Sequence, residues 1–222
     1  MSRSVGARTQ HLLRPEAPIR TAGSARVGPM VVYGVLAAVA VTAALVQGRS
    51  PLEVDALLPF ERSSVAGHFV SLVAGGALAV LTIGATRQFV RRWDWARSLH
   101  SHLRPAVKHA GGGTILMLGL ASAIGEELFF RGLLTTTFGV IVSSIAFGLL
   151  HQMRGRARWV WAGWATVMGV LFGGLFLATG SLLGPLVAHA AINVANLRFL
   201  RDTDFDPPKL RRLGGLLADR RA

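Results

Sequence analysis

The 222 residues include no cysteine, which excludes disulfide bonds, thiolate nucleophiles and Cys-ligated zinc sites within this sequence. Acidic side chains are also scarce, since 11 Asp and Glu stand against 24 Lys and Arg, for a formal net charge of +13. A basic balance of this size can indicate nucleic-acid binding. Only 16% of the residues are charged, however, and long apolar runs leave no room for a continuous basic face. No nucleic-acid partner is therefore expected.

The apolar runs indicate a membrane protein. Hydrophobic residues make up 51% of the 222 positions, and the mean hydropathy is +0.47. A chain of this length suits about six membrane helices of roughly 20 residues with short loops. We therefore predict an all-α, polytopic transmembrane helix bundle. The expected spans cover residues 29–47, 64–86, about 110 to 126 and beyond, a helix ending near 151, one ending near 178, and about 182–197.

The distribution of basic residues predicts the orientation. The N-terminal tail, the segments 87–109 and 154–158, and the C-terminal tail are rich in Lys and Arg, whereas the intervening loops are not. With six spans these four segments fall on one side, which the positive-inside rule assigns to the cytoplasm. We expect a multi-pass protein of the inner (plasma) membrane with both termini cytoplasmic, an uncleaved first span, and Trp93 and Trp95 as interfacial anchors in a loop over 87–109.

Three charged residues lie inside an apolar run, namely Glu126, Glu127 and Arg131. Each charge at membrane depth costs on the order of 2.5–3.5 kcal/mol on insertion scales, so ionisable residues there usually serve function. Glu127 and Arg131 are spaced to pair on a helix, while Glu126 points about 100° away and is expected to face a different wall. The alternative is a buried ion network that only fixes helix packing.

Two further apolar helices carry polar groups. His151 ends one, and His189 and Asn193 lie one turn apart on another. Taken singly, His151 would be a helix-end cap, and His189 and Asn193 would form hydrogen bonds between helices that only stabilise their packing. Taken together with Glu126, they supply a carboxylate and an imidazole that can deprotonate water, and donors for a developing oxyanion. Zinc held by Glu126, His151 and His189 is the alternative.

The remaining histidines are expected at surface, interface or packing positions. They are His11, His68, His100, His102 and His109.

Three motifs resemble those of the CPBP family (CAAX proteases and bacteriocin-processing enzymes, also called Abi). They are Glu126-Glu127-Leu-Phe-Phe-Arg131 for EExxxR, Phe147-Gly-Leu-Leu-His151 for FxxxH, and His189-Ala-Ala-Ile-Asn193 for HxxxN. The motifs stand in the family's order on separate apolar helices, and the resemblance covers about residues 111–196. It implies an intramembrane endopeptidase that cleaves near a C-terminus or a leader of a membrane-associated protein or peptide.

The resemblance also implies roles for single residues. Glu126 and His151 would activate water, and His189 and Asn193 would stabilise the oxyanion. Glu127, Arg131 and Phe147 would support the site. Because every residue then has a role without a metal, we expect no cofactor, with zinc as the alternative.

The chain divides accordingly into four parts. They are a basic cytoplasmic tail (1–28), two membrane helices with a basic loop (29–104), a CPBP-like catalytic bundle (105–200) and a charged cytoplasmic tail (201–222). The partners expected are the bilayer and a protein or peptide substrate. The alternative functions are a non-enzymatic membrane scaffold or immunity protein, and a proton-coupled transporter.

One geometric point is left open. A turn near residue 138 would place Glu126 and His151 at similar depth in the membrane. His151, however, lies only a few residues before the expected cytoplasmic loop, whereas Glu126 lies about 16 residues into its helix. The third helix is therefore expected either to start below the membrane surface or to kink near Gly111–Gly113.

Overall fold

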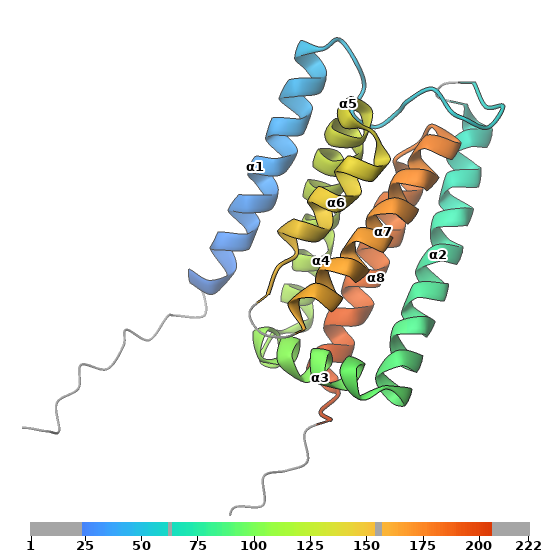
Figure 1. Ribbon diagram of the computed structural model, residues 1–222. Coiled ribbons are helices and arrows are strands. Elements are labelled where there is room, and N and C mark those ends of the chain that lie inside the picture. Colours follow the sequence, from blue (N-terminus) through green and yellow to red (C-terminus); the bar gives the residue numbers. More distant parts are fainter. Residues whose placement is uncertain (1–23, 62–63, 154–156, 206–222) are drawn as a thin grey trace, which may run out of the picture.

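The computed structural model describes residues 24–61, 64–153 and 157–205, with side chains from residue 28 onward. Apart from one isolated β-bridge, between Glu53 and Ser181, its regular elements are helical. The two predicted tails lie almost wholly outside the described residues. The helices are α1 (Ser24–Val46), α2 (Val65–Arg92), α3 (Asp94–Leu103), α4 (Gly112–Glu126), α5 (Thr136–Phe138), α6 (Val140–Leu150), α7 (Arg158–Thr179) and α8 (Leu183–Asp202), with a 3₁₀ turn η1 (Arg104–Ala106) and a π-helix η2 (Glu127–Thr135) (Figure 1).

In the part of the chain that the structure describes, four apolar helical stretches are long enough to cross a membrane, which identifies a multi-pass membrane protein. They are Gly28–Val46, Val65–Arg92, Gly112–Phe138 and Arg158–Thr179. The prediction of six spans is met in part, because α6 and α8 run along the bundle without being long apolar spans (Figure 1). With 11 residues, α6 reaches only about 16 Å. The polar residues of α8 reduce its hydropathy, and it packs inside the bundle against α2 and α4.

The loop between α1 and α2 closes one end of the bundle. Backbone hydrogen bonds join it to the turn between α7 and α8, with Val54 N donating to Gly180 O over 3.0 Å and Leu182 N donating to Leu52 O over 2.9 Å. Gly180 takes a positive φ of 70°, which lets the chain reverse there. His68 Nδ1 lies 2.8 Å from Ser181 Oγ, so the top of α2 joins the same polar contact.

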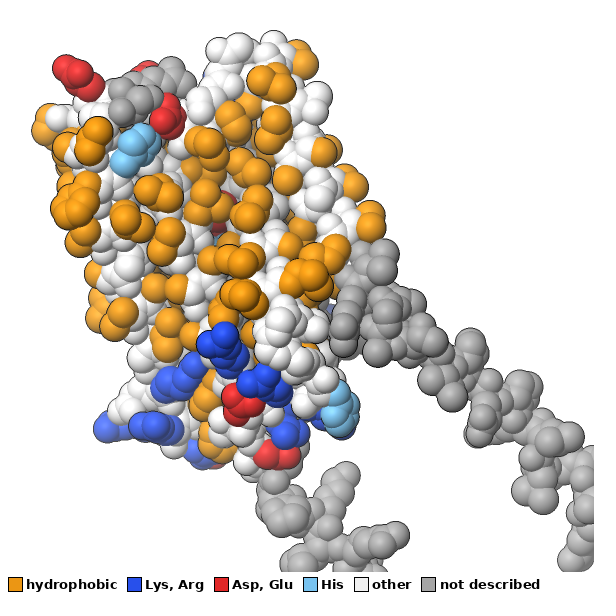
Figure 2. Space-filling view, turned by 180° about the vertical axis from the view of Figure 1, so that it is seen from behind, with side chains coloured by type: hydrophobic (Ala, Val, Ile, Leu, Met, Phe, Trp, Pro, Cys, Tyr) orange, Lys and Arg blue, Asp and Glu red, His pale blue; other side chains and the backbone are white. Residues whose placement is uncertain are grey.

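The prediction of a basic loop over 87–109 was wrong. Helix α2 continues to Arg92, and α3 then lies across the other end of the bundle (Figure 1). This segment is amphipathic, since it buries Ala96 and His100 while its charged residues face outward. Figure 2 shows Lys and Arg gathered at this end, below a broad belt of hydrophobic side chains. We call it the basic end.

His151 reaches the level of Glu126 because the helix that precedes it is short. Helix α4 starts at Gly112 and runs without interruption through η2 and α5 to Phe138. The short helix is α6, which ends at Leu150, whereas α7 begins only at Arg158. His151 therefore lies part-way along the bundle, at the level of Glu126. Non-helical backbone at such depth is tolerated where it lines a cavity within the protein.

Candidate functional site

The EExxxR segment forms the junction of α4 with the π-helix η2, whose first residue is Glu127. A π-helix shifts its hydrogen bonds to i→i+5 and often marks a functional site. Two of its backbone carbonyls accept hydrogen bonds from side chains of other segments. Ser143 Oγ donates to Phe130 O over 2.7 Å, and Arg49 Nη1 donates to Gly132 O over 2.6 Å. The three charged residues of the motif are all buried, with exposed fractions of 8% for Glu126, 0% for Glu127 and 1% for Arg131.

Glu127 is the centre of a buried hydrogen-bond network. Its Oε1 accepts from Arg131 Nη1 over 2.9 Å, as the spacing predicted, and also contacts His189 Nδ1 over 2.7 Å. Because Glu127 Oε1 accepts from the guanidinium, it carries no proton itself, and His189 Nδ1 is the donor in their contact. The Arg131 guanidinium also lies 4.5 Å from the ring centre of Phe147. The sequence indicated the Glu127–Arg131 pair but not the contact with His189.

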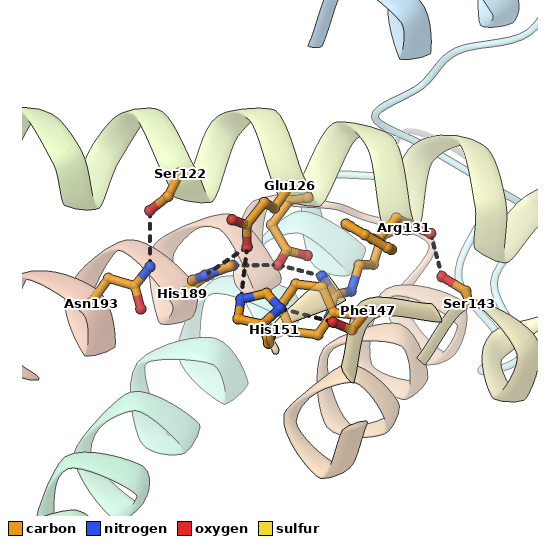
Figure 3. Close-up of polar contacts among 10 residues, drawn as sticks. Ser122, Glu126, Arg131, Ser143, Phe147, His151, His189 and Asn193 are labelled. Atoms are coloured by element: carbon orange, nitrogen blue, oxygen red, sulfur yellow. Dashed lines mark hydrogen bonds and ion pairs between the residues drawn. The ribbon is translucent and has the colours of Figure 1, made fainter. Parts of the chain in front are cut away.

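Glu126 faces both histidines (Figure 3). Its Oε2 lies 3.6 Å from His151 Nε2 and 3.7 Å from His189 Nε2. His151 Nδ1 lies 2.8 Å from the carbonyl oxygen of Phe147, which can only accept, so Nδ1 carries a hydrogen and Nε2 points to Glu126. His189 contacts both carboxylates, Glu127 through Nδ1 and Glu126 through Nε2, which the sequence did not indicate.

Asn193 lies one turn beyond His189 and has a partner that the sequence analysis missed. Its Nδ2 donates to Ser122 Oγ over 2.9 Å, and Ser122 Oγ donates to Gly119 O over 3.2 Å. Ser122 precedes Glu126 by four residues on α4, so helical spacing was the available signal. Phe147 packs against both histidines, with its ring centre 4.3 Å from that of His151 and 6.1 Å from that of His189.

A cavity of about 570 Å³ opens beside these residues. Glu126, His151, His189, Asn193 and Ser122 contribute to its wall. Most of its other lining residues are apolar, and they come from α1, α2, α3, α7 and α8. The cavity extends to the α3 helix at the basic end, which makes it a path from the polar cluster toward that end of the molecule.

Residues 112–195 match the family model described as type II CAAX prenyl endopeptidase Rce1-like. This segment is an Rce1-like domain. The match confirms the resemblance carried by the three motifs. The Rce1-like domain holds the whole polar cluster on α4, η2, α6 and α8, whereas α1, α2 and α3 lie outside it.

A similar protein is "Uncharacterized protein YpbD" of Bacillus subtilis (strain 168), which is 35% identical over 79 residues. The alignment covers 36% of this chain and 41% of that protein, so the chain spans less than half of its relative. No solved structure matches.

The zinc alternative concerns Glu126, His151 and His189. Within the described ranges, no group of three or more His, Asp or Glu side chains is arranged to hold a metal ion. Glu126, His151 and His189 meet at one carboxylate oxygen, and that oxygen, Glu126 Oε2, is buried without a hydrogen-bond donor among the described residues. Their described contacts are those of one carboxylate oxygen lying between two imidazoles.

Proposed function

We propose that this protein is an intramembrane endopeptidase in which Glu126 and His151 activate a water molecule. The observation that carries the proposal is the meeting of His151 Nε2 and His189 Nε2 at Glu126 Oε2, at 3.6 and 3.7 Å, on the wall of a cavity in an Rce1-like domain. A base at this position takes a proton from water as the water oxygen attacks a peptide carbonyl. The C–N bond then breaks, and the proton passes to the leaving nitrogen.

Charge balance supports this assignment. The two carboxylates of Glu126 and Glu127 face one guanidinium, Arg131, and an unbalanced charge is costly where water is excluded. One proton shared among Glu126, His151 and His189 neutralises the group. A cluster that holds one mobile proton can accept a proton from water and return it to the leaving amine. Glu127 and Arg131 keep His189 oriented throughout, because its Nδ1–H is bound to Glu127.

Asn193 supplies a donor to the oxyanion. One of its two N–H bonds is held by Ser122, which fixes the plane of the amide, and the other remains for a substrate oxygen. His189 contributes through Nε2 when it carries the shared proton. Phe147 contacts both imidazoles and the Arg131 guanidinium, which holds the three groups together.

The substrate is a peptide bond near a C-terminus or leader of a membrane-associated protein or peptide. An apolar cavity that extends from the polar cluster to the basic end suits a hydrophobic segment entering from that side. By the positive-inside rule the basic end faces the cytoplasm, in the inner (plasma) membrane.

The proposed mechanism is independent of a metal, and zinc bound by Glu126, His151 and His189 is the competing mechanism. Purified protein dialysed against 1,10-phenanthroline should keep its full activity. A loss that added zinc restores would favour the metallopeptidase.

The decisive experiment compares the membrane peptidomes of cells that express wild type or Glu126→Gln at equal levels. Glu61→Gln serves as the matched control, because Glu61 lies in the exposed loop at the opposite end from the basic residues. Terminal fragments should disappear in Glu126→Gln and persist in Glu61→Gln. Identical peptidomes from all three proteins would reject the peptidase and favour a scaffold or carrier function.

A further inference from the structure

The sole tyrosine of the chain, Tyr33, lies outside the Rce1-like domain and yet lines the same cavity as Glu126, Ser122 and Asn193. It belongs to α1, and Pro29 one turn earlier lines the cavity as well. Helix α1 therefore contributes a side chain with a hydroxyl to a wall that the family motifs do not describe.

A close helix contact fixes the position of Tyr33. A Cβ atom on Gly125 would lie 2.6 Å from Tyr33 O and 3.0 Å from Tyr33 Cβ. The backbone of α1 thus rests directly on the residue that precedes Glu126, and only glycine allows this approach. Tyr33 and Glu126 therefore lie on two helices that pack together at this point, and both residues line the cavity.

The oxyanion donors assigned so far, Asn193 and His189, both belong to α8. Asn193 commits one N–H to Ser122, and His189 commits Nδ1–H to Glu127. His189 Nε2 and His151 Nε2 both face Glu126, so His189 donates to the oxyanion only while its Nε2 carries the shared proton. The Tyr33 hydroxyl forms no hydrogen bond with another described residue, and a phenol keeps its hydrogen at neutral pH.

We propose that Tyr33 is a further catalytic residue, whose hydroxyl donates a hydrogen bond to the carbonyl oxygen of the substrate as that oxygen becomes negative. It acts from α1, while the free N–H of Asn193 acts from α8. The role rests on the proposed peptidase function. Because an oxyanion donor is needed mainly in the transition state, its removal lowers kcat without weakening substrate binding.

The test uses a synthetic peptide that spans a cleavage site found by comparing wild type with Glu126→Gln, and purified Tyr33→Phe protein in proteoliposomes. Tyr33→Phe keeps the ring and removes the hydroxyl. We expect kcat and kcat/KM to fall together by about 10²-fold, the usual loss for one oxyanion donor. The matched control, Thr42→Val, removes a hydroxyl from an exposed position of the same helix and should keep the wild-type kcat.

The absence of cysteine allows a second measurement of location. Tyr33→Cys should react with a small charged methanethiosulfonate in open membranes. Val32→Cys should not react, because Val32 is 55% exposed on the outer surface of the bundle, where it faces lipid. An unreactive Tyr33→Cys, an unchanged kcat in Tyr33→Phe, or a rise in KM alone would each overturn the role of Tyr33. If wild type and Glu126→Gln are alike, the peptidase itself is rejected, and the role of Tyr33 is rejected with it.

Discussion

His189 donates from Nδ1 to Glu127 Oε1 over 2.7 Å, and this contact ties the last helix of the bundle to the start of the π-helix. The same oxygen accepts from Arg131 over 2.9 Å. Glu127 therefore has a structural part that Glu126 lacks, because it neutralises a fully buried cation and also sets the orientation of an imidazole. Two adjacent glutamates in one motif are thus expected to fail in different ways when they are replaced.

Glu127→Ala should destabilise the protein, whereas Glu126→Ala should leave it folded. Removal of Glu127 leaves the Arg131 charge buried without its counter-ion, which costs about 3–5 kcal/mol for a buried pair broken on one side. The unfolding of both variants in detergent, followed by the thermal loss of helical circular dichroism, measures the difference. The double variant Glu127→Ala/Arg131→Met removes both charges and should regain part of the lost stability. Equal stability of Glu127→Ala and wild type would contradict the network described above.

Ser122→Ala should lower kcat by about tenfold, with little effect on folding. The substitution frees the Asn193 amide, whose Nδ2 then loses the hydrogen bond that fixes its plane, worth about 1 kcal/mol or somewhat more. Assay of peptide cleavage at saturating substrate measures the effect. Ser144→Ala is the matched control, because Ser144 Oγ bonds to Val140 O of its own helix and to no other described residue, and it should keep the wild-type rate. A wild-type rate in Ser122→Ala would mean that the Asn193 orientation does not matter.

The helical class and the polar cluster could be predicted from the sequence, because intramembrane charges and ordered motifs are visible in it. The exact depth of His151 could not, since it depends on how soon α6 ends, and no proline or glycine marks Leu150 as the last helical residue. The π-helix was also out of reach, because an i→i+5 pattern leaves no period in so short a segment. The contact between His189 and Glu127 could not be predicted either, because the two residues lie 62 positions apart in the sequence.

Helix α3 shows a second limit of the sequence argument. The basic residues over 87–109 predicted a loop, and the structure has a helix there. The count of charges ignored the amphipathic pattern that buries Ala96 and His100. His100 contacts the carbonyl oxygen of Thr203 through Nε2 over 3.0 Å, so α3 is held against the end of α8. Tertiary contacts of this kind decide whether a polar segment becomes a surface helix.

Gly125→Ala should separate α1 from α4 and lower both stability and activity. A methyl group at this position would meet the backbone of Tyr33 at 2.6 Å, and backbone cannot move aside as a flexible side chain can. Overpacking of this type typically costs about 1–3 kcal/mol. Gly84→Ala in α2 is the control, since nothing lies within 4 Å of its new methyl group, and a helix gains about 0.5–1 kcal/mol from alanine there. Thermal unfolding should rank Gly84→Ala above wild type and Gly125→Ala below it.

The orientation of the bundle can be tested with single cysteines, because the natural chain has none. Ser98→Cys places an exposed thiol on α3 at the basic end, and Leu57→Cys places one at the opposite end, where Leu57 is 79% exposed. If the positive-inside rule governs insertion, a membrane-impermeant maleimide added to spheroplasts should label Leu57→Cys and leave Ser98→Cys unlabelled until the membrane is opened. The reverse pattern would place the basic end outside. In that case the cavity, which extends to α3, would take its substrate from outside the cell, and a cytoplasmic C-terminus would no longer be a candidate substrate.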